Sequence, residues 1–92
     1  MKATVELSHF DRGMYAAKLE DTQLYAVFEI FDECVPDLGD LLEHGAFHAV
    51  GNQIYMDITK GRSIELVAKG LYDLGGAKSA CLLLPFTRLA RM

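Results

Sequence analysis

The sequence has few cysteines and no long apolar run, and each absence excludes a class of protein. Its two cysteines, Cys34 and Cys81, allow at most one disulfide, so the chain is not a disulfide-rich secreted scaffold. No stretch approaches the roughly 18 apolar residues that a membrane-spanning helix needs. The first residues include Lys2, Glu6 and His9 and lack the apolar core of a signal peptide. We therefore predict a cytoplasmic protein without a membrane partner, with both thiols reduced and buried.

The sequence also lacks the short motifs that mark common enzymes and metal sites. It has no nucleophile elbow, no phosphate-binding glycine loop and no dinucleotide fingerprint. On a strand, His44 and His48 would lie about 13 Å apart, which is too far to share one ion. The acidic stretch from Asp32 to Glu43 lacks the alternating ligands of a calcium loop, and Pro36 interrupts it. We therefore predict no enzyme activity, no catalytic residue, no metal site and no cofactor.

What the chain does have is the composition of an ordinary globular domain. It has 92 residues, of which 51% are apolar and 24% charged, so we expect one small folded domain over residues 1–92. This apolar content excludes a disordered chain. A chain of this length buries only about 60–65% of its unfolded surface. The core is therefore thin, and self-association would bury more apolar surface.

Charge is distributed unevenly along the chain. Residues 1–59 carry three Lys or Arg against eleven Asp or Glu, a net charge of −8. Residues 60–92 carry six against two, a net charge of +4. Such an asymmetry orients self-association or makes one part of the surface attractive to anions.

Short stretches of alternating apolar and polar residues predict β-strands. In Ala3–Leu7, for example, every second residue is apolar and shares one face. The strand at Leu24–Phe31 is apolar on both faces, so we expect it to lie centrally or to cover a partner. The other expected strands are Met14–Leu19, Phe47–Val50 and Ile54–Thr59, the last two joined by a hairpin turn at Gly51-Asn52-Gln53.

Residues 63–74 fit two patterns. Ile64, Leu66 and Ala68 alternate as on a strand, but the same segment also fits a helix with Ser63 as its N-cap. We favour a strand, because the sheet needs one more strand after the hairpin.

The C-terminal part predicts a helix. Asp73 is expected to cap a helix over Leu74–Leu84 that Pro85 ends, followed by a basic segment at residues 86–92. The expected fold class is mainly β (α+β): a small, open, antiparallel barrel of about five strands with a C-terminal helix.

The central segment carries a resemblance to known barrels. Between Leu24 and Thr59, a two-faced strand is followed by the corner Leu38-Gly39-Asp40-Leu41 and then by a hairpin. Glycine permits the backbone geometry that a sharp strand bend needs, and Asp40 is expected to lock the corner by bonding local N–H groups. This layout resembles short uncharacterised bacterial proteins with a small OB- or SH3-like β-barrel. The resemblance implies a barrel and assigns no functional residue.

The functional prediction follows from the apolar and aromatic side chains. A domain this small cannot bury both faces of Leu24–Phe31, so we predict a non-enzymatic interaction module that binds a second copy of itself or another protein. The expected interface residues are Tyr15, Tyr25, Val27, Phe31 and Tyr55. The alternative is an OB-like single-stranded nucleic-acid-binding protein that uses the basic second half. Its expected anion-binding residues are Lys69, Lys78, Arg88 and Arg91.

Overall fold

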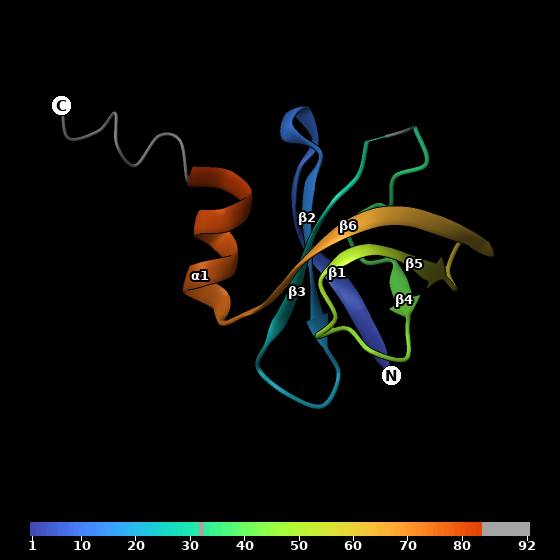
Figure 1. The fold of residues 1–92 in the computed structure, drawn as a ribbon, viewed down its shortest axis with the longest axis horizontal. Helices are drawn as coiled ribbons and strands as arrows, with labels where there is room; N and C mark the ends of the chain where they lie inside the picture. Colours follow the sequence, from blue (N-terminus) through green and yellow to red (C-terminus); the bar gives the residue numbers. More distant parts are fainter. Residues whose placement is uncertain (32, 84–92) are drawn as a thin grey trace, which may run out of the picture.

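Six antiparallel strands close into a barrel, with a short helix after the last strand (Figure 1). The computed structural model describes residues 1–31 and 33–83. The strand order around the barrel is β1-β2-β3-β6-β5-β4. The elements are β1 (Lys2–His9), a 3-10 turn η1 (Phe10–Arg12), β2 (Met14–Leu19), β3 (Tyr25–Glu29), β4 (Leu41–Glu43), β5 (Gly51–Asp57), β6 (Arg62–Tyr72), α1 (Leu74–Lys78) and a π-helical turn η2 (Ser79–Leu83).

The mainly β barrel with a C-terminal helix is confirmed, with six strands in place of about five and a closed rather than an open sheet. The short strand β4 makes the difference, because it pairs with both β1 and β5, as in Ala3↔Leu42 and Leu42↔Asp57. The favoured strand at Ser63–Lys69 is confirmed as part of β6, which pairs with β5 and then with β3.

The predicted strand at Phe47–Val50 is wrong, because these residues form a turn and a loop. Phe47 is nevertheless buried, so its apolar side chain enters the core from a turn. The predicted hairpin turn at residues 51–53 is also wrong, since these residues begin β5. Local pattern alone could not place the turn, because residues 51–53 are drawn into β5 by their pairing with β6.

A row of aromatic rings fills the barrel. Phe28 stacks on Tyr15 with ring centroids 5.8 Å apart and meets Tyr55 edge-on at 5.3 Å. Phe47 meets the other side of Tyr55 at 4.9 Å. The hydroxyls of both tyrosines are buried without a hydrogen-bond partner among the described residues, so these side chains contribute packing. Burial raises the pKa of Tyr55 to about 12.

The helix covers one outer face of the barrel. Ala77 and Cys81 pack against Met14, Ala16 and Val27, on the outer sides of β2 and β3. As predicted, the Asp73 side chain caps the helix by accepting a hydrogen bond from the Gly76 N–H at 2.7 Å. The capped helix therefore shields the apolar outer face of β2 and β3 from water.

The two cysteines lie in different environments. Cys81 is buried, as predicted, and burial raises the pKa of its thiol to about 11. The prediction that Cys34 is buried is wrong, because it lies exposed on the loop between β3 and β4. Within the described residues, no helix has the length and hydropathy needed to cross a bilayer.

Candidate functional site

The outer face of β5 carries exposed apolar side chains that the helix does not cover. Ile54 is 58% exposed, and Met56 and Ile58 are 42% and 38% exposed. Their neighbours Tyr55 and Asp57 point into the barrel and are fully buried. Figure 1 places β4, β5 and the start of β6 on the side of the barrel away from α1. Among the described residues, the helix therefore covers one apolar outer face and leaves a second one exposed.

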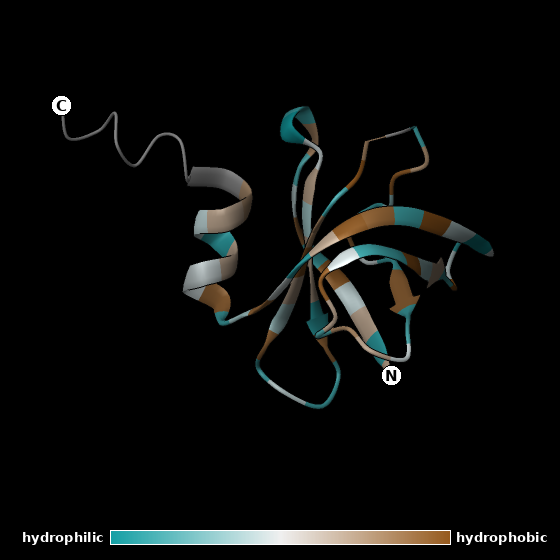
Figure 2. Cartoon of the chain, viewed as in Figure 1, coloured by the Kyte–Doolittle hydropathy of each residue, from teal (hydrophilic) through white to brown (hydrophobic). Residues whose placement is uncertain are grey.

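An open groove of about 860 Å³ crosses this second face. The strand order β3-β6-β5-β4 places Phe31, just after β3, on one side of it and His44, just after β4, on the other. Figure 2 shows hydrophobic and hydrophilic residues alternating along β6, on the side away from α1. The groove is lined by Phe31, His44, Asn52, Gln53, Ile54, Glu65, Leu66 and Val67. We call this surface the β5–β6 groove.

The β5–β6 groove combines apolar side chains with a single acidic one in its described lining. His44 Nε2 donates a hydrogen bond to the side-chain oxygen of Gln53 at 3.1 Å, so these two polar groups partner each other. Among the described residues, Glu65 is the one acidic residue that lines the groove, and no Lys or Arg lines it. Glu65 lies directly across from Ile54 in the β5–β6 pairing, so an acid and an apolar anchor are side by side.

The structure places only one of the five expected interface residues on the open surface. Phe31 is 74% exposed and lines the groove, whereas Tyr15, Tyr25, Val27 and Tyr55 are buried. Tyr15 and Tyr55 fill the barrel, and Val27 lies beneath the helix. A partner of this folded chain would therefore contact Phe31 alone among the five.

Tyr25 is also held inside the protein by a polar contact. Its hydroxyl donates a hydrogen bond to the carboxylate of Glu6 at 3.1 Å. Burial, together with this bond to Glu6, raises the pKa of Tyr25.

The expected anion-binding residues lie outside the groove lining or outside the described residues. Lys69 forms an ion pair with Glu29 at 3.2 Å. Lys78 is exposed on α1, on the other side of the barrel. Arg88 and Arg91, with the rest of the expected basic segment at 86–92, lie outside the described residues. The two described lysines are therefore not brought together at the groove.

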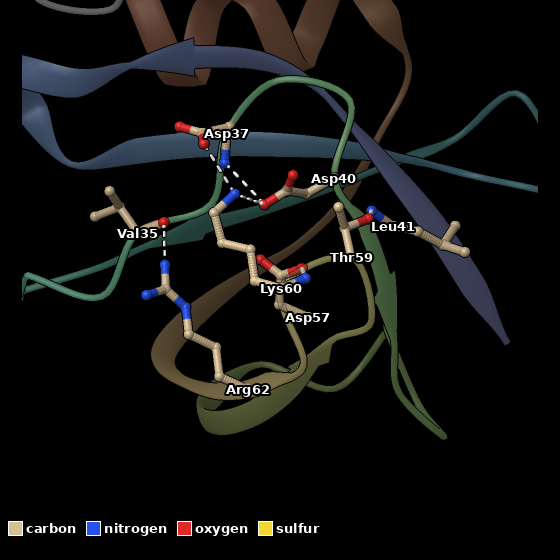
Figure 3. A network of polar contacts seen from close by, with 8 residues as sticks. All are labelled: Val35, Asp37, Asp40, Leu41, Asp57, Thr59, Lys60 and Arg62. Carbon is tan, nitrogen blue, oxygen red and sulfur yellow. Dashed lines mark hydrogen bonds and ion pairs between the residues drawn. The ribbon is translucent and has the colours of Figure 1, made fainter.

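A second cluster of polar side chains ties two loops together at one end of the barrel (Figure 3). Asp40 accepts hydrogen bonds from the Asp37 N–H at 3.0 Å and from the Lys60 ammonium. Lys60 also pairs with Asp37 at 2.8 Å, and its N–H donates to Asp57 Oδ1 at 3.0 Å. Arg62 donates to the carbonyl of Val35 at 2.7 Å. We call these contacts the loop clip, because they join the loop before β4 to the turn after β5.

The two buried carboxyls of the loop clip have opposite pKa shifts. Burial favours the neutral form of Asp40, but hydrogen bonds from Lys60 and from the Asp37 N–H outweigh it and hold its pKa below the ordinary value. Burial, together with the neighbouring Asp40 carboxyl, raises the pKa of Asp57 above the ordinary value. Asp57 Oδ2 has no hydrogen-bond partner among the described residues, so Asp40 acts on Asp57 as a nearby negative charge.

The loop clip holds two carboxyls away from solvent. Asp40 is 4% exposed and Asp57 is fully buried. Among the described residues, no group of three or more His, Cys, Asp or Glu side chains could hold a metal ion. The positive charge beside Asp40 comes from the Lys60 ammonium. The expectation that Asp40 locks the corner through a local N–H is confirmed. Gly39 has a positive φ of 92° in this corner, a backbone conformation that glycine adopts without steric cost.

Opposite effects are expected when the two buried carboxyls are changed to amides. Asp40→Asn removes the negative charge that binds Lys60 and should lower the free energy of unfolding at pH 7 by about 1.5–3 kcal/mol. Asp57→Asn keeps an oxygen for the Lys60 N–H and removes a carboxyl that is costly to ionise when buried. Its stability at pH 7 should be unchanged or higher. Urea unfolding of both variants and the wild type measures this.

The pH dependence of the two variants should also differ. Because the pKa of Asp40 is lowered by folding, its contribution is present above the pKa of an unfolded aspartate and is lost as the pH falls through the folded value. Because the pKa of Asp57 is raised, the wild type loses stability as the pH rises from the unfolded value through the folded one. Asp57→Asn should lack that loss. Equal destabilisation by both variants at pH 7 would contradict these assignments.

In residues 1–31 and 33–83, the fold and the groove define a small closed β-barrel with a capped helix after the last strand and an exposed apolar groove over β5 and β6. No protein-family model, curated protein or solved structure matches this chain. Of the expected resemblance to short bacterial barrel proteins, the structure shows the small barrel layout.

The sequence reasoning missed most of the residues that line the groove. The available signal was the alternation of Ile54, Met56 and Ile58, which shows that β5 has one continuous apolar side. That signal does not show which side faces the core. The tyrosine at position 55 favoured the wrong choice of exposed side, because a tyrosine is common both in cores and at interfaces.

Proposed function

We propose that this protein is a non-enzymatic protein–protein interaction module that binds its partner, in the first place a second copy of itself, through the β5–β6 groove. One observation carries the proposal. The outer face of β2 and β3 is covered by the chain's own helix, while the comparable face over β5 and β6 leaves Phe31 and Ile54 more than half exposed. Burying one such side chain fully stabilises a contact by about 1.5–3 kcal/mol, so these two residues are the expected anchors.

The closed barrel supports docking on a face rather than at a strand edge. Each strand has a neighbour on both sides in the barrel order. Adding a partner strand to a sheet requires an unpaired edge. A partner therefore gains most by laying apolar side chains into the groove.

The charges of the groove support a protein partner over single-stranded nucleic acid. Nucleic-acid grooves combine aromatic side chains with Lys or Arg that track the phosphates. The β5–β6 groove has Phe31 and His44, but its charged side chain is the acid Glu65. Fluorescence polarisation with labelled oligonucleotides at about 50 mM salt separates the two proposals, because phosphate contacts are strongest at low salt.

Ile54→Lys should weaken self-association at least tenfold. The substitution places a charge at the centre of the groove, on a side chain that is already 58% exposed, so the fold is retained. Sedimentation velocity of the full chain at micromolar concentrations should show a wild-type dimer and an Ile54→Lys monomer, with the dissociation constant raised about tenfold or more.

Leu38→Lys is the matched control, because Leu38 is 62% exposed but does not line the groove. It should dimerise like the wild type. A wild-type chain that stays monomeric at about 100 µM, a concentration at which even weak dimers populate, would contradict self-association. Loss of the dimer in the control as well would contradict the placement of the interface.

A further inference from the structure

We propose that the chain's own residues 84–92 bind in the β5–β6 groove, so that a second copy must displace them in order to dimerise. The inference rests on the proposed function, because it names the segment that regulates access to the same groove. Three observations carry it: the position where the described chain ends, the length of chain that follows, and the charge of that segment against the charge of the groove.

The described chain ends on the outer face of the sheet, two strands away from the groove. Cys81, in the last turn, packs against Met14 on the outer side of β2. Met14 lies opposite Glu29 in β3, and Glu29 lies opposite Val67 in β6. Val67 and its partner Asn52 in β5 both line the groove. One row of paired residues therefore leads from the end of the helix to the groove.

Residues 84–92 are long enough to follow this row and to fill the groove. Neighbouring strands lie about 4.8 Å apart, so two steps from β2 to β6 amount to about 10 Å and a third step to β5 gives about 14 Å. An extended chain covers about 3.3 Å per residue, so the nine residues after Leu83 reach about 30 Å. About three residues suffice to reach β6, which brings Phe86 to the edge of the groove and leaves residues 87–92 to lie along it.

The side chains of the segment complement those of the groove. Phe86 and Leu89 are large and apolar. The groove offers them apolar contacts at Phe31 and Ile54, which are both more than half exposed. The segment has two arginines and no acid, a net charge of +2, whereas residues 1–83 have a net charge of −6. In the described lining of the groove an arginine meets the Glu65 carboxylate and no lysine or arginine.

The covalent link favours the chain's own segment over the same segment of a second copy. A short link gives a contact within one chain an effective concentration on the order of millimolar. A second copy at micromolar concentration offers its segment about a thousandfold more dilute. The segment therefore closes onto its own groove first, and a second copy binds there when the segment is displaced.

A tryptophan placed in the segment tests where the segment lies. The chain has no tryptophan, so Phe86→Trp gives a single tryptophan reporter in the full chain. A tryptophan covered by the groove should emit at a shorter wavelength than the same variant unfolded in urea. The emission should stay the same between about 1 and 100 µM protein, because a contact within one chain does not depend on concentration, whereas a dimer does.

A charge change in the groove locates the contact. In the Phe86→Trp background, Glu65→Arg gives the groove the same charge as the segment and should shift the emission towards that of the unfolded chain. Glu20→Arg is the matched control, because Glu20 is exposed and does not line the groove, and it should cause no shift. Adding Arg88→Glu and Arg91→Glu to Glu65→Arg should restore the shorter wavelength.

Release of the segment should strengthen the dimer. Phe86→Ser with Leu89→Ser removes both apolar anchors without changing the net charge. An occupied groove weakens the apparent affinity by the fraction of molecules in which it is free, so the double variant should lower the dissociation constant in sedimentation velocity by about threefold or more. Leu38→Ser, an exposed leucine outside the groove lining, should leave it unchanged.

The outcomes separate this inference from the proposed function. An emission like that of the unfolded chain overturns the inference, and so does a shift that appears only at high protein concentration, which would assign the segment to a second copy. A short-wavelength emission that Glu65→Arg leaves unchanged also overturns it, because the segment would then pack elsewhere. A double serine variant that dimerises no more tightly than the wild type overturns the competition. A wild-type monomer at about 100 µM contradicts the proposed function, and the emission of that monomer still decides whether the segment occupies the groove.

Discussion

Phe28→Ala should lower the free energy of unfolding by about 3–5 kcal/mol, the range for removing a buried aromatic side chain. Phe28 is fully buried between the rings of Tyr15 and Tyr55, so its loss leaves a cavity with aromatic walls at the centre of the barrel. The barrel is closed by strand pairing all the way round, so its walls cannot collapse freely into that space. Small domains have only about 5–15 kcal/mol of stability. The measurement is urea unfolding followed by circular dichroism.

Phe10→Ala is the matched control for this prediction. Phe10 lies in η1 and is 71% exposed, so the same change of side chain should alter stability by less than about 0.5 kcal/mol. A loss below about 1.5 kcal/mol for Phe28→Ala would fall under the range for buried aromatics. It would show that the aromatic row contributes little to the free energy of unfolding.

Gly13→Ala is the second change with a large expected effect. Gly13 has a φ of 68°, and a Cβ placed there would lie 2.6 Å from the carbonyl oxygen of Ile30. Alanine in left-handed backbone costs about 1–2 kcal/mol, and relieving such a contact typically costs about 1–3 kcal/mol more. The expected loss is therefore about 2–5 kcal/mol. Because Ile30 is hydrogen-bonded to Gly13 and precedes Phe31, the change should also displace one wall of the groove.

Gly61→Ala isolates the effect of the contact. Gly61 has the same φ of 68°, but no atom lies within 4 Å of a Cβ placed there. Only the backbone cost of about 1–2 kcal/mol should remain. Thermal and urea unfolding of both variants gives the difference. Two variants of equal stability would refute the steric part of this argument, and weaker dimerisation in Gly13→Ala alone would tie the contact to the groove.

The parts of the fold that were predictable from sequence are those that neighbouring residues determine. The short, mostly apolar stretch Met14–Leu19 was predicted as a strand and forms β2 with the same bounds, and Asp73 predicts the start of the helix three residues before the Gly76 N–H it caps. Asp40 in its glycine corner predicts a local hydrogen bond. For the helix cap and the corner, the partner groups lie within a few residues, so local chemistry is sufficient.

The groove was not predictable in the same way. Its lining comes from residues after β3 and β4 and from the middle of β5 and β6, which only strand pairing brings together. Phe31 was identified because an apolar residue at the end of a two-faced strand needs a partner. The identity of its neighbours across the groove depends on the order β3-β6-β5-β4, and no local pattern encodes that order.

The amino-acid sequence alone predicted a single small β-rich domain and an acidic body with a basic C-terminal segment. It left open which of two faces of the strand around Tyr55 lies in the core. The tertiary structure decided which of those faces is exposed to solvent. Tyr55 pairs with Ile64 and joins Phe28 in the core, and Asp57 is buried where it holds the turn at Lys60, so Ile54, Met56 and Ile58 are left outside. The reason is that side chains on a strand alternate with a period of two, so the register against β6 turns a whole face inward or outward at once.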